Sequence, residues 1–234
     1  MHLEHGAAWQ VLQVEVPAMQ GGLIDEAGVC FWTPDTKVKK GYQLVALVDD
    51  LRFEGQPDYS VELRNEKAEV WSERHTDITQ FSRMKGTARM EDGQMRIACE
   101  DEGEWYTGST KWQDYDAAFT MTLEKGESCL ALVRVQGAIR SYAAGIENGR
   151  LVIQKNDNGY RTLAETPCPV QPHEKMTLAV SVRGREISAR CGGVTVRCTD
   201  DSERPYLNGA VGAAVRDGGE ALLESIRIRG VETR

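Results

Sequence analysis

The sequence has little of what catalytic and metal-binding proteins usually show. Among its 234 residues there are only four histidines, and none of them stands in a His-x-His pair or near a cysteine at zinc-site spacing. A Gly-x-Ser-x-Gly segment, which would present a hydrolase nucleophile, is absent. A glycine-rich phosphate loop preceding a helix is absent too. The sequence therefore contains none of these catalytic or metal-binding motifs.

Clustered positive charge and long apolar runs are also missing. The net charge is −8, and no dense Lys/Arg run is present that could contact phosphates. No apolar stretch is long enough to span a membrane, and the first residues lack the basic and apolar segments of a signal peptide. We therefore expect no nucleic-acid partner, no membrane partner and a cytoplasmic location.

The cysteine pattern agrees with a reducing compartment. Six cysteines are present, but no Cys-x-x-Cys pair occurs. An even count does not define a disulfide framework in a chain of this length. Most of the six lie among apolar residues, where a free thiol packs as a small hydrophobe.

Apolar residues alternate with polar ones at period two, which predicts half-buried antiparallel strands. Clear examples are Met95–Cys99, Phe119–Leu123, Leu178–Val182, Ile187–Cys191 and Val194–Cys198. Gly192-Gly193 and Glu91-Asp-Gly93 are typical of hairpin turns. Helical patterns are scarce, with one short turn predicted between Glu73 and Phe81. The fold class is therefore all-β.

The strands predict two β-sandwich domains. Residues 1–72 form a small N-terminal sandwich, with strands over Trp9–Val16, Val29–Trp32, Tyr42–Val48 and Tyr59–Leu63. Residues 73–234 supply roughly ten strands, which is the number that a jelly roll needs. We expect the larger domain to carry the functional surface.

Two resemblances refine this prediction. From Phe81 onward, segments such as Trp112-Gln-Asp-Tyr-Asp-Ala-Ala-Phe119 and Gly209-Ala-Val-Gly212 resemble concanavalin-like and keto-glycoside hydrolase-like jelly rolls. Arg134–Gly145, Lys155–Arg161 and Arg204-Pro-Tyr-Leu-Asn-Gly209 resemble the C-terminal non-catalytic region of bacterial ADP-ribosylglycohydrolase-family proteins. That family's activity depends on acidic clusters that hold magnesium in a helical domain, which this chain lacks. The resemblance therefore implies an accessory module beside a sugar-processing enzyme.

The candidate ligand-binding residues fall into three groups. The first is a hairpin with Arg134, Gln136, Arg140 and Tyr142, where guanidinium groups could fork to an anion or hydroxyl pair and Tyr could stack on a sugar. The second is the turn region with Lys155, Tyr160 and Arg161. The third is Glu104, Trp105 and Tyr106. The competing interpretation is structural: Arg134 pairs with an acid across the sheet, Tyr142 and Trp105 fill the core, and Asn156–Asn158 only make a turn.

Carboxylates suggest two further roles. Glu102 and Glu104 could perform acid/base chemistry on a glycosidic bond, although the Glu-x-Asp-x-Glu pattern of family-16-like glycosidases is absent. Asp114, Asp116, Asp200 and Asp201 could hold a structural calcium ion. We otherwise expect no cofactor and no catalytic residue.

The function predicted from the sequence is non-catalytic recognition of a carbohydrate or glycan-like molecule, with a catalytic domain as a further partner. The first alternative is a glycoside hydrolase-like enzyme that uses a carboxylate pair on a concave sheet. The second is a protein–protein interaction module. All three depend on one sheet being hollowed toward solvent, with the hairpin around Arg134 beside the hollow.

Overall fold

The computed structural model describes Trp9, residues 11–15, 28–30 and 47–50, Arg52, and residues 57–65 and 81–231. Contacts divide the chain into two units, Met1–Leu47 and Val48–Arg234. Every strand found in the described residues belongs to the second unit. No helix in the described part of the chain is long and apolar enough to cross a membrane.

One sheet of the second unit has eight antiparallel strands. Seven follow the order β13-β12-β11-β6-β15-β4-β3, and β1 pairs with β15 beside β4. Their bounds are β1 (Asp58–Glu62), β3 (Thr87–Glu91), β4 (Gln94–Ala98), β6 (Tyr115–Lys125), β11 (Lys175–Arg183), β12 (Glu186–Cys191), β13 (Val194–Thr199) and β15 (Glu220–Gly230). A 3-10 helix, η1 (Leu63–Asn65), follows β1.

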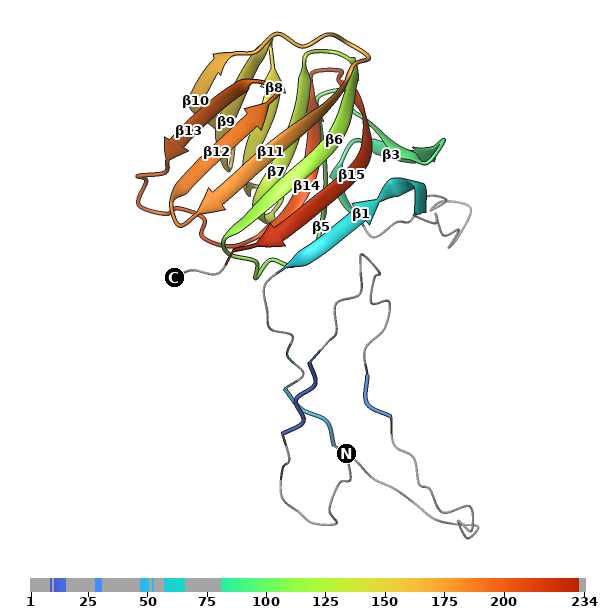
Figure 1. The fold of residues 1–234 in the computed structure, drawn as a ribbon, viewed down its shortest axis with the longest axis vertical. Helices are drawn as coiled ribbons and strands as arrows, with labels where there is room; N and C mark the ends of the chain where they lie inside the picture. Colours follow the sequence, from blue (N-terminus) through green and yellow to red (C-terminus); the bar gives the residue numbers. More distant parts are fainter. Residues whose placement is uncertain are drawn as a thin grey trace. The chain divides into compact units, whose positions relative to one another are not determined.

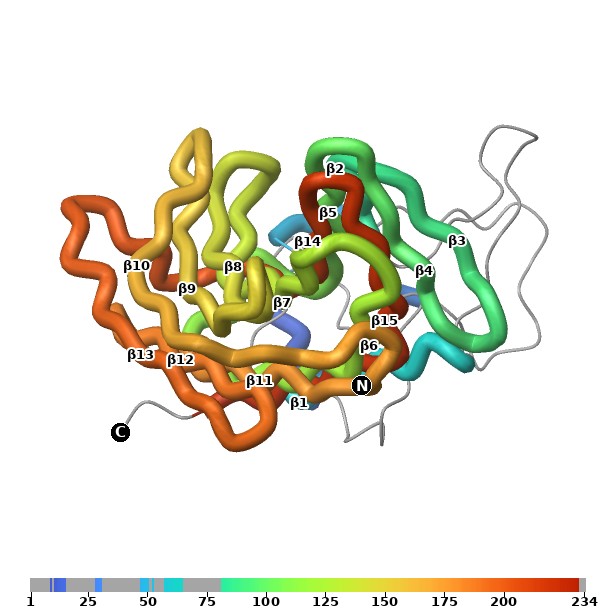
Figure 2. The backbone as a smooth tube through the Cα atoms, turned by 90° about the horizontal axis from the view of Figure 1, so that it is seen from above, coloured from blue at the N-terminus to red at the C-terminus, as the bar shows by residue number. Residues whose placement is uncertain are grey.

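The other sheet has seven antiparallel strands in the order β10-β9-β8-β7-β14-β5-β2. Their bounds are β2 (Ser82–Lys85), β5 (Glu102–Thr107), β7 (Ser128–Gly137), β8 (Arg140–Glu147), β9 (Arg150–Asp157), β10 (Tyr160–Pro167) and β14 (Ala210–Arg216). Figures 1 and 2 show the two sheets stacked as the layers of a sandwich.

Period-two alternation builds the core between these layers. In β11, the buried residues Leu178, Val180 and Val182 face the other sheet, and Phe119 and Met121 do the same from β6. Because each strand buries one face, a one-residue slip would expose its whole apolar set. The all-β prediction is confirmed, and so are the strands predicted from this alternation.

The predicted hairpin turns are also found. Glu91 pairs with Gln94, so Asp92 and Gly93 form a two-residue turn. Both have positive φ angles, of 50° and 76°, as a type I′ turn requires. Cys191 pairs with Val194 around the predicted Gly192-Gly193 turn.

Only part of the predicted N-terminal sandwich falls among the residues that the structure describes. The strand predicted at Tyr59–Leu63 is β1, but it pairs with β15 of the large sandwich. Residues 11–15, 28–30 and 47–50 are described and carry no strand, and Val11 and Val14 are exposed there, so the alternation buries no face. The predicted turn at Glu73–Phe81 and the rest of residues 1–72 lie almost wholly outside the described residues, so this domain stays a prediction.

Candidate functional site

The hairpin predicted around Arg134 is formed by β7 and β8, and a β-bulge turns Arg134 into the sandwich. Leu130 and Leu132 belong to a second apolar cluster on the outer face of the seven-stranded sheet. Regular alternation would place Arg134 on that outer face. The register instead shifts between Val133 and Gly137, and Arg134 adopts a positive φ of 49°. The bulge therefore reverses the direction of this side chain.

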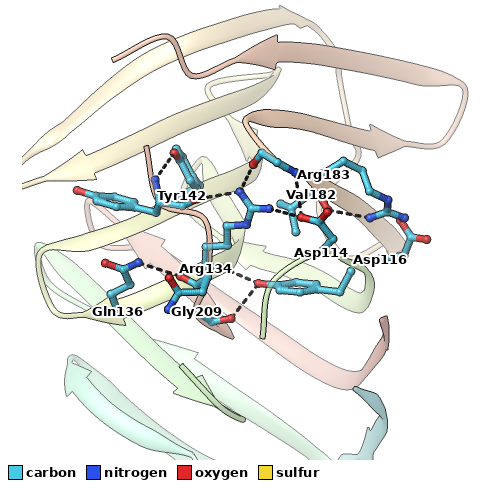
Figure 3. Close-up of polar contacts among 12 residues, drawn as sticks. Asp114, Asp116, Arg134, Gln136, Tyr142, Val182, Arg183 and Gly209 are labelled. Carbon is cyan, nitrogen blue, oxygen red and sulfur yellow. Dashed lines mark hydrogen bonds and ion pairs between the residues drawn. The ribbon is translucent and has the colours of Figure 1, made fainter. Parts of the chain in front are cut away.

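Arg134 is 1% exposed and binds groups from three segments outside the strands. One guanidinium nitrogen lies 2.9 Å from an Asp114 carboxylate oxygen. The second terminal nitrogen of the guanidinium donates to the Gly184 carbonyl and, at 2.7 Å, to the Tyr206 carbonyl (Figure 3). Burial lowers the pKa of Arg134, and Tyr115 and Asp114 oppose this only in part. Arg134 has no surface to offer a ligand, which corrects the prediction of direct contact.

Tyr142 and Lys155 also face the interior, as the alternation of their strands requires. Each is 1% exposed, and both contact the buried carboxylate of Asp200, at 2.5 Å and 2.7 Å. Burial alone would raise the pKa of Asp200, but hydrogen bonds from Lys155, Tyr142 and Ser202 outweigh it and hold that pKa well below its ordinary value. Direct ligand contact by Tyr142 and Lys155 is therefore corrected as well.

These buried polar side chains hold one irregular segment, residues 200–209, which we call the 200–209 loop. Lys155 Nζ donates to the Arg204 carbonyl at 2.6 Å and to the Ser202 hydroxyl at 2.7 Å. The Tyr206 amide donates to the Tyr142 hydroxyl at 2.9 Å, while its carbonyl accepts from Arg134. The predicted binding residues thus form a supporting layer beneath the loop.

The 200–209 loop and the hairpin enclose a pocket of about 300 Å³. Gln136 and Arg140 line it from the hairpin, so both stay candidates for ligand contact. The full lining is Gln136, Arg140, Asp157, Arg204, Pro205, Tyr206, Leu207 and Asn208. The pocket is therefore a candidate binding site at one end of the sandwich.

Sequence reasoning missed the loop's contribution to this pocket. Arg204, Leu207 and Asn208 belong to the stretch Arg204–Gly209, which we quoted above only for a family resemblance and did not name among the ligand-binding residues. A sign of the loop's role was available in the sequence, because β8 and β9 carry polar residues at positions that the alternation turns toward the core. Alternation placed Tyr142 and Lys155 inside, and such groups need partners from a neighbouring segment.

A second polar cluster lies on the outer face of the seven-stranded sheet. The Tyr160 hydroxyl on β10 donates to Glu104 on β5, although four strands separate them in the sheet. The sheet is therefore strongly curled (Figure 2). The Arg216 guanidinium lies 3.7 Å from the centre of the Tyr160 ring and binds Glu147 and Gln154, each at 2.7 Å.

This cluster fills the hollow that the sequence suggested for a ligand. Glu104 is 2% exposed, and burial raises its pKa despite the Tyr160 hydrogen bond. Burial and the neighbouring Glu104 raise the pKa of Tyr160 to about 12. Tyr106, also predicted to bind ligand, is half-buried against the apolar floor beneath the cluster.

The remaining predicted residues divide between core and surface. Trp105 is 1% exposed and packs between the sheets, so its ring cannot stack on a ligand. Arg161 is exposed and lies 3.7 Å from Asp200. It does not line the pocket.

The acids proposed for calcium are mostly engaged in ion pairs. Asp114 pairs with Arg134, Asp116 with Arg183 and Asp200 with Lys155. Within the described ranges, no group of three His, Cys, Asp or Glu residues is placed to hold a metal ion.

Comparison with solved structures identifies the type of fold. The carbohydrate-binding module CBM66 from Bacillus subtilis is 14% identical with a TM-score of 0.58, over 64% of this chain and 96% of that one. A Bacillus subtilis protein with a galectin-like fold is 11% identical with a TM-score of 0.54, over 78% of this chain and 99% of that one. The fold is a concanavalin-like jelly roll.

A third structure shares this jelly roll. SCLam, a non-specific endo-β-1,3(4)-glucanase of family GH16, is 9% identical with a TM-score of 0.52, over 74% of this chain and 90% of that one. Identities this low establish a shared fold and not a shared activity. No protein-family model matches the chain, and no curated protein matches it in sequence. The ADP-ribosylglycohydrolase resemblance thus stays a prediction.

Proposed function

We propose that the protein binds a carbohydrate without changing it chemically, and that the pocket beside the 200–209 loop is the binding site. One observation carries this proposal. The buried ion pair of Lys155 and Asp200, together with buried Arg134, holds the backbone of a loop that lines a pocket. Burying such charges costs free energy. Apolar contacts would be enough to hold a loop that had no binding role.

The support beneath the loop fixes its shape before a ligand arrives. A preformed loop loses little conformational freedom on binding, and this saves free energy that would otherwise oppose association. Binding sites gain precision when a supporting layer locks their lining residues. The arrangement of Arg134, Tyr142 and Lys155 is of this kind.

The lining suits a hydroxyl-rich ligand. Amides from Gln136 and Asn208 and guanidinium groups from Arg140 and Arg204 offer both acceptors and donors. Leu207, 47% exposed, adds apolar surface for the carbon face of a sugar ring. The carbohydrate-binding module among the solved structures of this fold supports the same class of ligand.

The test is a binding screen with matched variants. We expect the full chain to bind members of a glycan array without releasing sugar. Arg140→Ala should weaken that binding by about tenfold, whereas Arg227→Ala, an exposed arginine on the other sheet, should not change it. Equal binding by both variants, with both folded, would assign the ligand to another surface.

A glycoside hydrolase is the second candidate, because Glu104 is a buried carboxyl with a raised pKa, as a general acid needs. Sugar release that disappears in Glu104→Gln would establish it and end the non-catalytic proposal. We also propose the accessory role beside a sugar-processing enzyme that the family resemblance implies. A stable complex with such an enzyme, without glycan binding, would instead favour the protein–protein alternative.

A further inference from the structure

Two arginines line the pocket, one from the hairpin and one from the 200–209 loop. Arg140 begins β8 at the hairpin, and Arg204 belongs to the 200–209 loop. Both residues are exposed, and neither makes an ion pair with any residue that the structure describes. Asp157 supplies the one carboxylate among the lining residues. The pocket thus carries a net positive charge, while the whole chain carries −8.

The single carboxylate, Asp157, is exposed and ends β9, the strand beside Arg140. Asp157 is the strand partner of Arg140. Burial first, and then the Asp157 carboxylate, raise the pKa of Tyr206 to about 12. The Tyr206 hydroxyl itself donates to the Asn156 carbonyl at 2.9 Å.

The position of Arg204 is fixed by its own backbone. Its carbonyl accepts from the buried Lys155 Nζ, and the following residue, Pro205, has a restricted φ angle. A guanidinium on a fixed backbone is a planar fork that matches the oxygens of a carboxylate, sulfate or phosphate.

The two lining amides leave their oxygens free for hydroxyl groups. Gln136 Nε2 donates to the Asn208 carbonyl at 2.9 Å, and Asn208 Nδ2 donates to the Thr110 carbonyl at 2.6 Å. With the nitrogens so used, Gln136 Oε1 and Asn208 Oδ1 have no partner among the described residues. These oxygens can accept protons from sugar hydroxyls.

We infer that the pocket binds an anionic sugar, with Arg140 and Arg204 on the anionic group and the oxygens of Gln136 and Asn208 on the hydroxyls. This inference rests on the proposed carbohydrate-binding function and specifies its ligand class. The anion can be a carboxylate, sulfate or phosphate, because all three present the same paired oxygens to a guanidinium.

The test compares ligands that differ only in charge. Calorimetric titration of the full chain with D-galacturonic acid and with D-galactose isolates the carboxylate. We expect galacturonic acid to bind at least about tenfold more tightly at low salt. Arg140→Gln and Arg204→Gln should each reduce that ratio to about threefold or less. The control Arg227→Gln, checked for folding by circular dichroism, should keep the full ratio.

Each remaining outcome decides something. Equal binding of the two sugars overturns the inference and leaves carbohydrate binding standing, whereas binding of neither sugar, nor of D-galactose 6-sulfate, overturns both. Galactose 6-sulfate as tight as galacturonic acid supports recognition of charge. Inorganic phosphate binding as tightly as either sugar overturns the sugar part, since the hydroxyl contacts would then contribute nothing.

Discussion

At the scale of single residues, the hydroxyl of Tyr115 links the bulge to the end of the 200–209 loop. It accepts the backbone N–H of Arg134 at 2.7 Å and lies 3.3 Å from the carbonyls of Gly209 and Ala210. Tyr115 is 0% exposed, and burial raises its pKa above the ordinary value for tyrosine. Its hydroxyl therefore acts as a neutral hydrogen-bonding group.

Replacing that hydroxyl should leave a buried N–H group without a partner. We expect Tyr115→Phe to lower the free energy of unfolding by about 1–3 kcal/mol, measured by urea denaturation. Tyr106→Phe is the matched control, since the Tyr106 hydroxyl makes no hydrogen bond within the described residues. Equal effects of the two substitutions would show that the hydroxyl does not support the bulge.

Glu104 gives a prediction about pH. Its pKa is raised in the folded protein, so the folded state holds the proton more tightly than the unfolded state does. Stability should therefore fall as pH rises above about 4, the ordinary range for a glutamate carboxyl. Glu104→Gln should flatten this slope and be at least as stable as the parent at neutral pH.

Denaturation curves between pH 4 and pH 7 measure that slope, and Glu100→Gln, at an exposed turn, serves as the control. A slope in Glu104→Gln as steep as in the parent would mean that Glu104 is not the group responsible.

At the scale of elements, the 200–209 loop depends on β9 for its shape. Lys155 Nζ contacts Asp200, Ser202 and the Arg204 carbonyl, whereas exposed Arg161 lies farther from Asp200, at 3.7 Å. Gly209 closes the loop against the bulge with a φ of 153°, where an added Cβ would lie 2.1 Å from the Arg134 carbonyl carbon. The loop therefore has very little freedom at either end.

Removing the central cation should show this dependence. We expect Lys155→Met to lower the free energy of unfolding by about 3–5 kcal/mol, because buried Asp200 loses its close cation and keeps only exposed Arg161 at 3.7 Å. Lys175→Met breaks the exposed pair with Glu224 and should cost about 0–1 kcal/mol.

The double variant Lys155→Met/Asp200→Asn should recover part of the loss, since it removes the unpaired charge as well. If Lys155→Met costs no more than Lys175→Met, the loop does not depend on the buried pair.

The strands were the feature of the molecule that the sequence predicted best. Alternation predicted strands such as β6, β11, β12 and β13. The same rule puts Lys155 on the face of Leu151 and Ile153, although we had assigned Lys155 to a ligand-binding turn. It could not place Arg134, because a bulge adds one residue and leaves no mark in the apolar pattern. Nor could it show that Tyr160 would meet Glu104, since the curl of a sheet depends on all its strands.

At the scale of the whole molecule, the sandwich has two polar regions, which differ in whether their arginines have ion-pair partners. On the outer face of the curled sheet, Tyr160 contacts both Glu104 and Arg216, and Arg216 pairs with Glu147. At the end of the sandwich, Arg140 and Arg204 face a pocket without ion-pair partners in the described chain. We therefore propose the end pocket as the ligand site, although the sequence pointed first to the concave sheet.

Amide chemical-shift mapping during a titration with a bound sugar tests this central claim most directly. The account predicts that shifts concentrate at Gln136, Arg140, Asp157, Arg204 and residues 206–208, and that Arg140→Ala suppresses them. Shifts centred on Glu104, Tyr160 and Arg216 instead would contradict it, because they would place the ligand on the curled sheet.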